Sequence, residues 1–320
     1  MKVLITGATG LVGKAITKVL HQHDIPVNYL TTRKDKIVSS EKYQGFYWNP
    51  KNGEIDTAAF AGVTAIINLA GATISKKWTS SYKQSVLDSR VESLRTLKSG
   101  LQEFGDAAIT SFVSASAIGI YPHSYTTLYS EEETGVDDSF LGEVVQKWEQ
   151  EIDAFSEFKF NVAKIRIGLV LSDQGGALPK MAQPVANYVG AAFGSGEQWQ
   201  SWIHIHDLAN MFLFVLENQL KGTFNGVAPN PVTNAKLTKE LAKVLKKPLF
   251  LPNIPKVMME LILGEMSYLL FASQRVSSKR IEKKGFIFEY RNICKALESF
   301  YEGNSCSEEA VQSTLEKNYS

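Results

Sequence analysis

Three regularly spaced glycines follow the first apolar run of the chain. Residues 3–5 suit a strand that is buried on both faces, and Gly7, Gly10 and Gly13 come directly after them. Apolar residues then recur at helical spacing, up to a second apolar run at 27–30. In such a βαβ unit the first glycine permits the turn, the second lets the backbone approach a phosphate, and the third lets the helix pack closely. The unit therefore predicts a dinucleotide site at the helix N-terminus, whose positive end faces phosphate. The predicted contacts are Gly7, Thr9, Gly10, Leu11 and Val12.

The end of the second strand indicates which dinucleotide is bound. This strand runs into Thr31-Thr32-Arg33-Lys34. A site for NAD(H) usually has a carboxylate about 20 residues after the glycines, where it binds the ribose 2′-hydroxyl. These four residues include no acid, and a guanidinium can bind a phosphate through two hydrogen bonds. Thr32 and Arg33 therefore favour NADP(H) as the cofactor; the alternative is that Arg33 and Lys34 are only a solvated strand end.

Six apolar runs alternate with helical patterns along the first half of the chain. They are residues 3–5, 27–30, 45–50, 65–72, 111–122 and 161–171. Strands that alternate with helices predict a doubly wound, parallel α/β sheet of the Rossmann type.

Small residues end the fourth of these runs. Leu69, Ala70 and Gly71 are expected beside the cofactor, because ligands of such sheets lie beyond the carboxyl ends of the strands. The simpler reading of Gly71 is a glycine that starts a helix. Ser114, where the strand end from Ser114 to Tyr121 begins in the fifth run, is expected at the same edge.

The pattern changes after Leu171. Glycine-rich loops with aromatic residues occupy 173–179 and 194–202, and helical segments follow from about residue 232. These features predict a dinucleotide-binding domain at 1–171, which the chain re-enters at about 200–230. A smaller, mainly helical substrate-capping lobe is expected at 172–199 and 231–303, with a flexible tail at 304–320.

The overall composition is that of an ordinary globular protein. The 320 residues are 44% hydrophobic and carry a net charge of +1, and the 34 lysines and arginines are spread along the chain. Nucleic acid and anionic membranes are therefore not expected as partners. The most apolar later stretch, 257–272, contains Glu260 and Glu265 and does not suit a membrane span.

The N-terminus and the cysteines bear on the compartment. The chain starts directly in a core strand, which leaves no room for a signal peptide. Cys294 and Cys306 have no partners at metal-ligand spacing. Both features favour a cytoplasmic location.

Several motifs together resemble a known family. Gly7-x-x-Gly10-x-x-Gly13, Asn68-Leu69-Ala70-Gly71 and the strand end from Ser114 to Tyr121 resemble the extended, atypical short-chain dehydrogenases/reductases of the NAD(P)-dependent epimerase/dehydratase superfamily. Within it, the chain is similar to the subgroup called epimerase family proteins, which have their own C-terminal domain. The motifs of this narrower likeness are Phe140-Leu141 with Trp148-Glu149, Gly175-Gly176-Ala177-Leu178, Ser201-Trp202-Ile203-His204 and Gly285-Phe286-x-Phe288.

The resemblance implies a catalytic Tyr-x-x-x-Lys pair and a serine that orients the substrate oxygen. Ser116 matches that serine, although a strand-end hydroxyl can equally serve the backbone. When Glu149 is matched to the acid that follows the usual motif, Leu141 and Val145 stand at the tyrosine and lysine positions. Neither side chain can carry a proton.

Three residues are candidates for the missing acid/base. They are Glu143 and Lys147 on the helix expected at about 140–155, and Tyr121 near the fifth strand. Glu143 and Lys147 are four residues apart, so a solvated salt bridge is the alternative reading of that pair.

Two histidines lie in a segment that reads as a strand. His204 and His206 alternate within 203–207 and would face one side, and Asp207 reads as the N-cap of a helix at 208–216. A third ligand at suitable spacing is missing, so no metal is expected. Buried, hydrogen-bonded histidines at the domain seam are the favoured reading.

Two functions follow from these observations. The first is an NADP(H)-dependent oxidoreductase or nucleoside-sugar epimerase-type enzyme that acts on an unidentified small molecule. The second is a nucleotide-binding regulatory protein that has kept the cofactor site and lost catalysis. The missing Tyr and Lys favour the second function, and the pocket-like loops favour the first. The resemblance also allows a homodimer.

Overall fold

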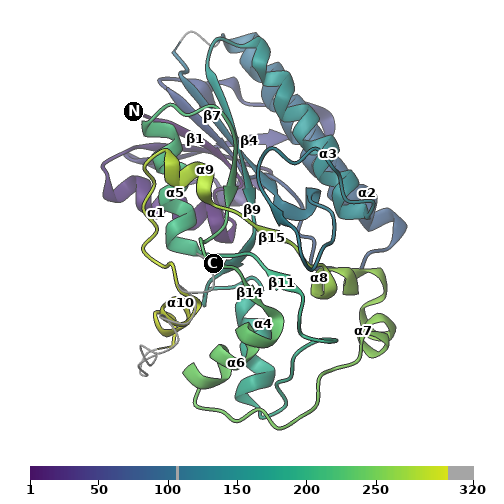
Figure 1. Cartoon of the computed structure of the whole chain (residues 1–320). Coiled ribbons are helices and arrows are strands. Elements are labelled where there is room, and N and C mark those ends of the chain that lie inside the picture. Colours follow the sequence, from purple (N-terminus) through teal and green to yellow (C-terminus); the bar gives the residue numbers. More distant parts are fainter. Residues whose placement is uncertain (106–107, 302–320) are drawn as a thin grey trace.

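A parallel sheet of seven strands runs through the larger part of the molecule (Figure 1). The computed structural model describes residues 1–105 and 108–301, so the tail expected at 304–320 lies outside the described residues. The order across the sheet is β13-β9-β7-β6-β1-β2-β4, with the short β3 and β5 antiparallel to β4. The strands are β1 Val3–Thr6, β2 Val27–Thr31, β3 Ser39–Ser40, β4 Tyr43–Asn49, β5 Glu54–Ile55, β6 Ala65–Asn68, β7 Ser111–Ala117, β9 Asn161–Ile167 and β13 Gly222–Gly226.

Helices cover both faces of this sheet. The helices α1 (Leu11–Gln22) and α5 (Ile205–Glu217) pack together on one face, and α2 (Ser80–Phe104) and α3 (Phe140–Asp153) pack together on the other (Figure 1). The starts of α2 and α3 are fixed by side chains, because the hydroxyls of Thr79 and Ser139 accept hydrogen bonds from backbone N–H groups in the first turns. The doubly wound α/β fold expected from the sequence is confirmed.

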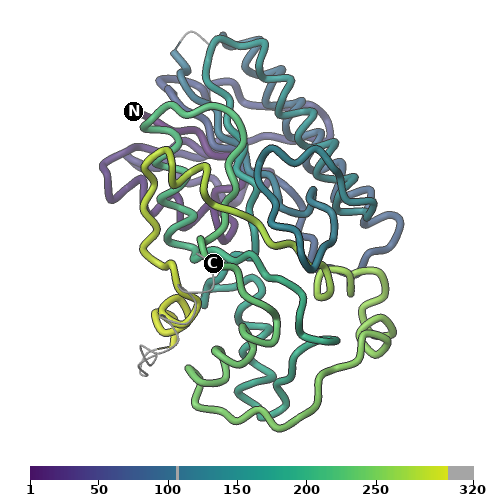
Figure 2. Tube along the Cα trace, viewed as in Figure 1, coloured from purple at the N-terminus to yellow at the C-terminus, as the bar shows by residue number. Residues whose placement is uncertain are grey.

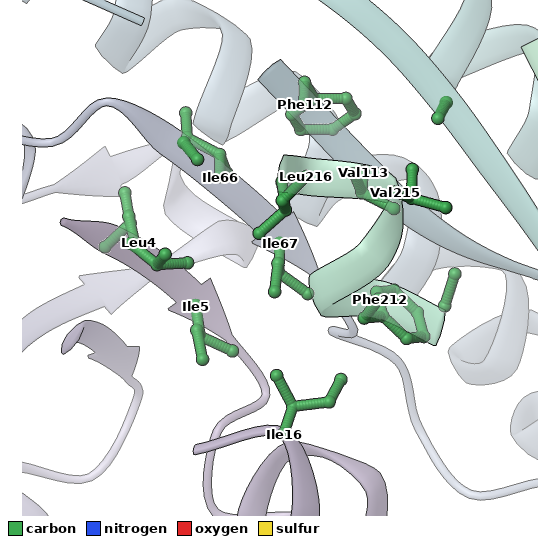
Figure 3. Close-up of a cluster of buried hydrophobic side chains, with 14 of the residues drawn as sticks. Leu4, Ile5, Ile16, Ile66, Ile67, Phe112, Val113, Phe212, Val215 and Leu216 are labelled. Atoms are coloured by element: carbon green, nitrogen blue, oxygen red, sulfur yellow. The ribbon is translucent and has the colours of Figure 1, made fainter. Parts of the chain in front are cut away.

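The main core lies between the sheet and its helices (Figure 3). Ile5 of β1 is in register with Ile67 of β6, and Ile67 is in register with Val113 of β7. Ile16 of α1 and Phe212 of α5 approach these strands from one face. All five side chains are fully buried, so this register is set by the burial of apolar surface.

The strand expected at 161–171 is in fact two strands. It breaks at Gly168, after which β10 (Leu169–Leu171) pairs with β12 (Trp202–His204) and leaves the main sheet. A Cβ on Gly168 would lie 2.2 Å from the carbonyl oxygen of Ser201, so only glycine fits where the two segments cross. The seventh strand of the sheet, β13, was not among the six expected strands.

The smaller lobe has its own core. The packed helices are α4 (Leu178–Ala186), α6 (Asn234–Val244) and α10 (Ile293–Glu298), beside the short strands β11 (Trp199–Gln200) and β14 (Val232–Thr233). Its buried side chains include Leu171, Leu178, Val185, Trp202, Leu237, Leu241 and Leu297. Two further helices, α7 (Lys256–Leu263) and α8 (Tyr268–Phe271), follow α6 in the chain.

After α8 the chain returns to the sheet domain (Figure 2). The strand β15 (Arg275–Val276) pairs with β8 (Leu128–Tyr129), and α9 (Lys279–Lys283) contacts β13. Ile281, Phe286 and Phe288 are buried in the main core. Residues 275–288 therefore pack on the sheet, although the sequence places them within the lobe at 231–303. Among residues 1–105 and 108–301, no helix has the length and apolar character needed to cross a bilayer.

Candidate functional site

The turn between β1 and α1 depends on two of its glycines for steric reasons. Gly7 has a φ of +73°, and a Cβ there would lie 2.9 Å from the carbonyl oxygen of Leu69. A Cβ on Gly13 would lie 2.3 Å from the carbonyl oxygen of Gly7. Gly10 differs, because its Cβ would have only one neighbour, at 3.3 Å, and its φ is an ordinary −75°. Gly7 and Gly13 therefore build the turn, and Gly10 leaves the space in front of it open.

The N-terminus of α1 has unused hydrogen-bond donors. Gly10 is its N-cap, no described side chain caps it, and its first turn contains no acid. The first N–H bonded within the helix is that of Lys14, which donates to the carbonyl oxygen of Gly10. The amides of Leu11 and Val12 are therefore free to bind an anion, and the helix dipole favours one there.

A hydrogen-bond network joins the carboxyl ends of β1 and β6 to the middle of the neighbouring β7. The Thr6 hydroxyl donates to the side-chain oxygen of Asn68 at 2.7 Å, and the Asn68 amide donates to the Ser114 hydroxyl at 2.9 Å. Thr6 also accepts the backbone N–H groups of Leu69 and Ala70. The network holds the loop after β6, which leads to Gly71, in place beside the glycine turn. Sequence reasoning did not find Thr6 or Asn68, whose roles depend on the strand order.

The loop after β10 lies against the start of α1. A Cβ on Gly176, whose φ is +78°, would lie 3.2 Å from a methyl group of Leu11. A Cβ on Gly175 would lie 3.8 Å from the same side chain. One of the glycine-rich loops predicted from the sequence therefore borders the proposed phosphate site directly.

Arg33 follows β2, as expected, but it has a partner that sequence reasoning missed. Its guanidinium donates to both carboxylate oxygens of Asp35, at 3.1 and 2.5 Å, and both side chains are largely exposed. Asp35 lies just beyond the stretch 31–34, in which an acid was sought. Thr32 is exposed beside Arg33, and the Lys34 ammonium lies over the ring of Tyr47. A phosphate that binds Arg33 through the same two N–H groups would displace the Asp35 carboxylate.

Ser116 is part of a buried polar cluster at the carboxyl end of β7. Its hydroxyl donates to a carboxylate oxygen of Glu149 at 2.6 Å. Arg166 binds the same carboxylate with two hydrogen bonds, at 2.8 and 2.9 Å. Burial alone would raise the pKa of Glu149, but Arg166, together with the Lys164 ammonium and the Ser116 hydrogen bond, outweighs burial and holds the pKa below its ordinary value. Glu149 therefore stays ionised and holds the Ser116 proton, which leaves the lone pairs of this hydroxyl as acceptors.

Tyr121 extends this cluster and is fully buried. Its hydroxyl donates to the side-chain oxygen of Asn225 at 2.7 Å and accepts from Arg166 at 3.0 Å. Burial raises the pKa of Tyr121 against the opposing effect of Arg166. The structure thus brings Ser116 and Tyr121 together through Glu149 and Arg166, two residues to which the sequence gave no role in the site.

Glu143 and Lys147 are not brought to this cluster. They form a salt bridge of 2.7 Å with each other, and both side chains are about half exposed. This geometry fits the alternative reading of the pair as a solvated ion pair. Leu141 and Val145, on the same helix, face the end of β7, because a Cβ on Gly119 would lie 3.6 Å and 4.0 Å from their side chains. Two apolar groups therefore stand where the resemblance places a tyrosine and a lysine.

A Tyr-x-x-x-Lys spacing does occur once, at Tyr47 and Lys51. There it spans the end of β4 and the 3-10 turn Pro50–Asn52, and not a helix. Three strands, β6, β1 and β2, lie between β4 and β7 in the sheet. This pair therefore cannot act on a substrate at Ser116.

A cavity of about 470 Å³ lies where the sheet domain meets the lobe. Its aromatic lining consists of Trp78, Phe140, Tyr268 and Phe271. Phe140 begins α3 directly before Leu141, whereas Tyr268 and Phe271 belong to α8 of the lobe. A small molecule held here would contact both parts of the chain.

The strand expected at 203–207 is wrong beyond His204. The helix α5 begins at Ile205, and the imidazole of His204 is its N-cap, with Nδ1 accepting the backbone N–H of His206 at 3.1 Å. His206 lies on the helix, so the two histidines do not alternate along a strand. Asp207 is not the cap; its carboxylate instead accepts the N–H groups of Glu289 and Tyr290. The part of the chain that the structure describes has no group of three potential metal ligands.

His204 makes the stability of the fold depend on pH. Burial, and then the neighbouring His206, lower the pKa of His204 from 6.5 to about 4. A second proton would sit on the nitrogen that caps α5. The folded state therefore resists protonation, and its stability is complete above pH 6.5 and is lost as the pH falls toward 4. Because of His204, we expect the free energy of unfolding to fall by about 2 kcal/mol between pH 7 and pH 5.

Urea unfolding at these two pH values checks this expectation against His204→Asn. Asparagine keeps a capping group and does not titrate. The variant is expected to lose less stability than the wild type on acidification. Equal losses in the two proteins would contradict the role given to His204.

Comparisons with known proteins agree with this geometry. Residues 3–226 match the model of the NAD dependent epimerase/dehydratase family, and residues 254–300 match a domain of unknown function, DUF1731. An epimerase family protein of Staphylococcus epidermidis is 37% identical over 296 residues, which are 92% of this chain and 97% of that protein.

Two solved structures are also similar. The human epimerase family protein SDR39U1 (isoform 2), crystallised with NADPH, has a TM-score of 0.82 and 26% identity, over 95% of this chain and 100% of that one. A nucleoside-diphosphate sugar epimerase from Corynebacterium glutamicum has a TM-score of 0.76 and 29% identity. This second match covers 99% of the present chain and 61% of the other.

Proposed function

The chain belongs to the NAD dependent epimerase/dehydratase family, and from that premise we propose that it is an NADP(H)-dependent oxidoreductase or epimerase-type enzyme. The observation that carries the proposal is the uncapped N-terminus of α1, with its free amides and without an acid. The NADPH in the crystals of the human relative supports the choice of cofactor.

The residues present fit a dinucleotide. The amides of Leu11 and Val12 would bind the diphosphate, with Gly10 leaving room for it. Arg33 would bind the 2′-phosphate after its carboxylate partner is displaced, beside Thr32. Leu69, Ala70 and Gly71 would line the far side of the site. The nicotinamide, when bound, donates or accepts a hydride.

The protein would place the substrate between the sheet and the lobe. Ser116 can accept a hydrogen bond from a substrate hydroxyl, since its own proton is held by Glu149. The cavity lined by Trp78 and Tyr268 would exclude water around the apolar part of the substrate. The lobe helices α7 and α8 would close this cavity.

Replacing Arg33 tests the choice of cofactor. We expect Arg33→Ala to weaken NADPH binding about 10- to 100-fold, because hydrogen bonds to charged groups contribute about 1.5–3 kcal/mol. NADH, which lacks the 2′-phosphate, is expected to bind both proteins equally. Titration calorimetry with each nucleotide measures the effect.

The matched control is Lys51→Ala, which removes an exposed cation elsewhere in the same domain. It is expected to leave the affinities for both nucleotides unchanged. Equal affinity of the wild type for NADPH and NADH would contradict the role of Arg33. A loss of NADPH affinity in the lysine variant as large as that in Arg33→Ala would point to general electrostatics instead.

One observation favours the second function, a regulatory protein without catalysis. Leu141 and Val145 occupy the positions that the resemblance gives to the acid/base pair, and the Ser116 hydroxyl is engaged by Glu149. A cofactor that binds tightly without turnover would suit a nucleotide sensor.

Ser116→Ala separates the two functions. For an enzyme, we expect NADPH oxidation with carbonyl or sugar-nucleotide substrates to fall at least about tenfold, while NADPH affinity stays the same. Steady-state assays over a substrate panel, with calorimetry in parallel, measure both quantities. Tight NADPH binding with no turnover on any substrate would support the regulatory protein.

A further inference from the structure

Arg90 of α2 packs against the loop after β6 and has no carboxylate partner among the described residues. One terminal nitrogen donates to the carbonyl oxygens of Ala72 and Val86, at 3.2 and 2.8 Å. A Cβ on Gly71 would lie 3.1 Å from the central guanidinium carbon. Since Gly71 follows the carboxyl end of β6, the cation borders the edge where ligands of such sheets bind.

The charge of Arg90 is not balanced within residues 1–105 and 108–301. No salt bridge is formed by this guanidinium, whereas Arg95 on the same helix pairs with Glu151, and Arg166 pairs with Glu149. Burial lowers the pKa of Arg90 to about 10, which still leaves the group charged at neutral pH. A desolvated cation without a counter-ion is costly for a fold, and an anionic ligand would remove that cost.

A second unpartnered donor lies next to Arg90. The indole N–H of Trp148 is buried and has no hydrogen-bond partner among the described residues. The guanidinium carbon of Arg90 lies 4.9 Å from the centre of that ring. Trp148 follows Val145 by one helical turn, on the side of α3 that carries the apolar pair facing β7. In the described part of the chain, an arginine with free N–H groups and an indole N–H without a partner therefore lie next to each other, beside the residues that occupy the positions of the family's catalytic pair.

We propose that Arg90 is the binding site for an anionic group of the substrate, a carboxylate or a phosphate. The guanidinium would bind two oxygens with its unused N–H groups, and the anion would replace the missing counter-ion. The inference rests on the proposed function, and it narrows the substrate to a small molecule with a negative charge near its reacting end.

The test uses inorganic phosphate as the probe and the indole N–H signal of Trp148 as the reporter. The signal is assigned by its loss in Trp148→Phe. In the full-length protein, with and without saturating NADPH, phosphate is expected to shift this signal in a saturable way. Arg90→Gln is expected to weaken the affinity for phosphate at least about tenfold. Arg90→Lys keeps the positive charge but cannot form two parallel hydrogen bonds, so it is expected to weaken this affinity by an intermediate factor.

Arg95→Gln is the matched control. It removes an exposed guanidinium from the same helix and is expected to leave the phosphate response unchanged. Circular dichroism shows whether each variant is folded. If Arg90→Gln does not fold, the proposal is judged by the phosphate affinity of Arg90→Lys.

Three outcomes would overturn the proposal. In the first, phosphate does not shift the Trp148 signal of the wild type. In the second, phosphate shifts this signal equally in Arg90→Gln and in the wild type. In the third, NADPH competes with phosphate, and NADPH binding itself requires Arg90. The last outcome would assign the residue to a cofactor phosphate. The Trp148 signal is also measured without NADPH, so the phosphate result does not depend on cofactor binding. If Arg33→Ala did not weaken NADPH binding, that would count against the proposed function and would leave the phosphate result at Arg90 unaffected.

Discussion

Replacing Glu149 with alanine is expected to lower the free energy of unfolding by about 3–5 kcal/mol, the usual cost of breaking a buried ion pair. The variant leaves the Arg166 guanidinium buried without its two carboxylate hydrogen bonds, and leaves the Ser116 hydroxyl without its acceptor. Chemical denaturation measures the loss. The wild type should also lose this stabilisation in acid, because a carboxylate with a lowered pKa stabilises the fold only while it is ionised.

Glu143→Ala is the matched control on the same helix. Its carboxylate pairs with Lys147 at the surface, so its loss is expected to cost less than about 1 kcal/mol. The double variant Glu149→Ala/Arg166→Met removes both buried charges. It is expected to recover part of the free energy of unfolding that Glu149→Ala loses. Equal effects of Glu143→Ala and Glu149→Ala would show that the buried cluster does not hold the end of β7 in place.

Gly13→Ala is expected to damage both the fold and the cofactor site. The new methyl group would meet the Gly7 carbonyl oxygen at 2.3 Å and the Ala8 backbone at 2.7 Å, and neither can move without opening the turn. Overpacking of this kind costs about 1–3 kcal/mol. The shift would also turn the first amides of α1 away from the diphosphate, so NADPH affinity is expected to fall at least about tenfold.

Gly10→Ala separates these two effects. A methyl group at Gly10 has one neighbour at 3.3 Å, so thermal stability should stay close to that of the wild type. NADPH affinity should still fall, because the methyl group points into the space left for the diphosphate. If Gly13→Ala melted and bound NADPH like the wild type, the account of the turn would be wrong.

The fold could be predicted where local patterns are strong. The run at residues 3–5, the glycine turn and the helical spacing after Leu11 determine the first βαβ unit without long-range information. β13 could not be predicted because Gly222–Gly226 begins and ends with glycine and has only one large apolar residue, Phe224. The break at Gly168 was missed because the clash that requires it comes from Ser201, far away in the sequence.

The candidate site could be predicted only in its local parts. Gly7 and Gly13 lie where the motif places them, since a turn and its helix are adjacent in the chain. The Ser116 cluster joins residues from β7, α3 and β9, so no spacing in the sequence reveals it. His204 was misread because an alternating pattern of two isoleucines and two histidines looks like a strand, while the cap that starts α5 depends on the imidazole orientation.

The central claim is that the start of α1 and the end of β2 together bind a 2′-phosphorylated dinucleotide. A crystal structure of the full chain with NADPH tests it most directly. We expect the diphosphate to accept hydrogen bonds from the amides of Leu11 and Val12, and the 2′-phosphate to replace the carboxylate of Asp35 at the guanidinium of Arg33. NADPH bound elsewhere, or bound here with Arg33 still paired to Asp35, would contradict the account.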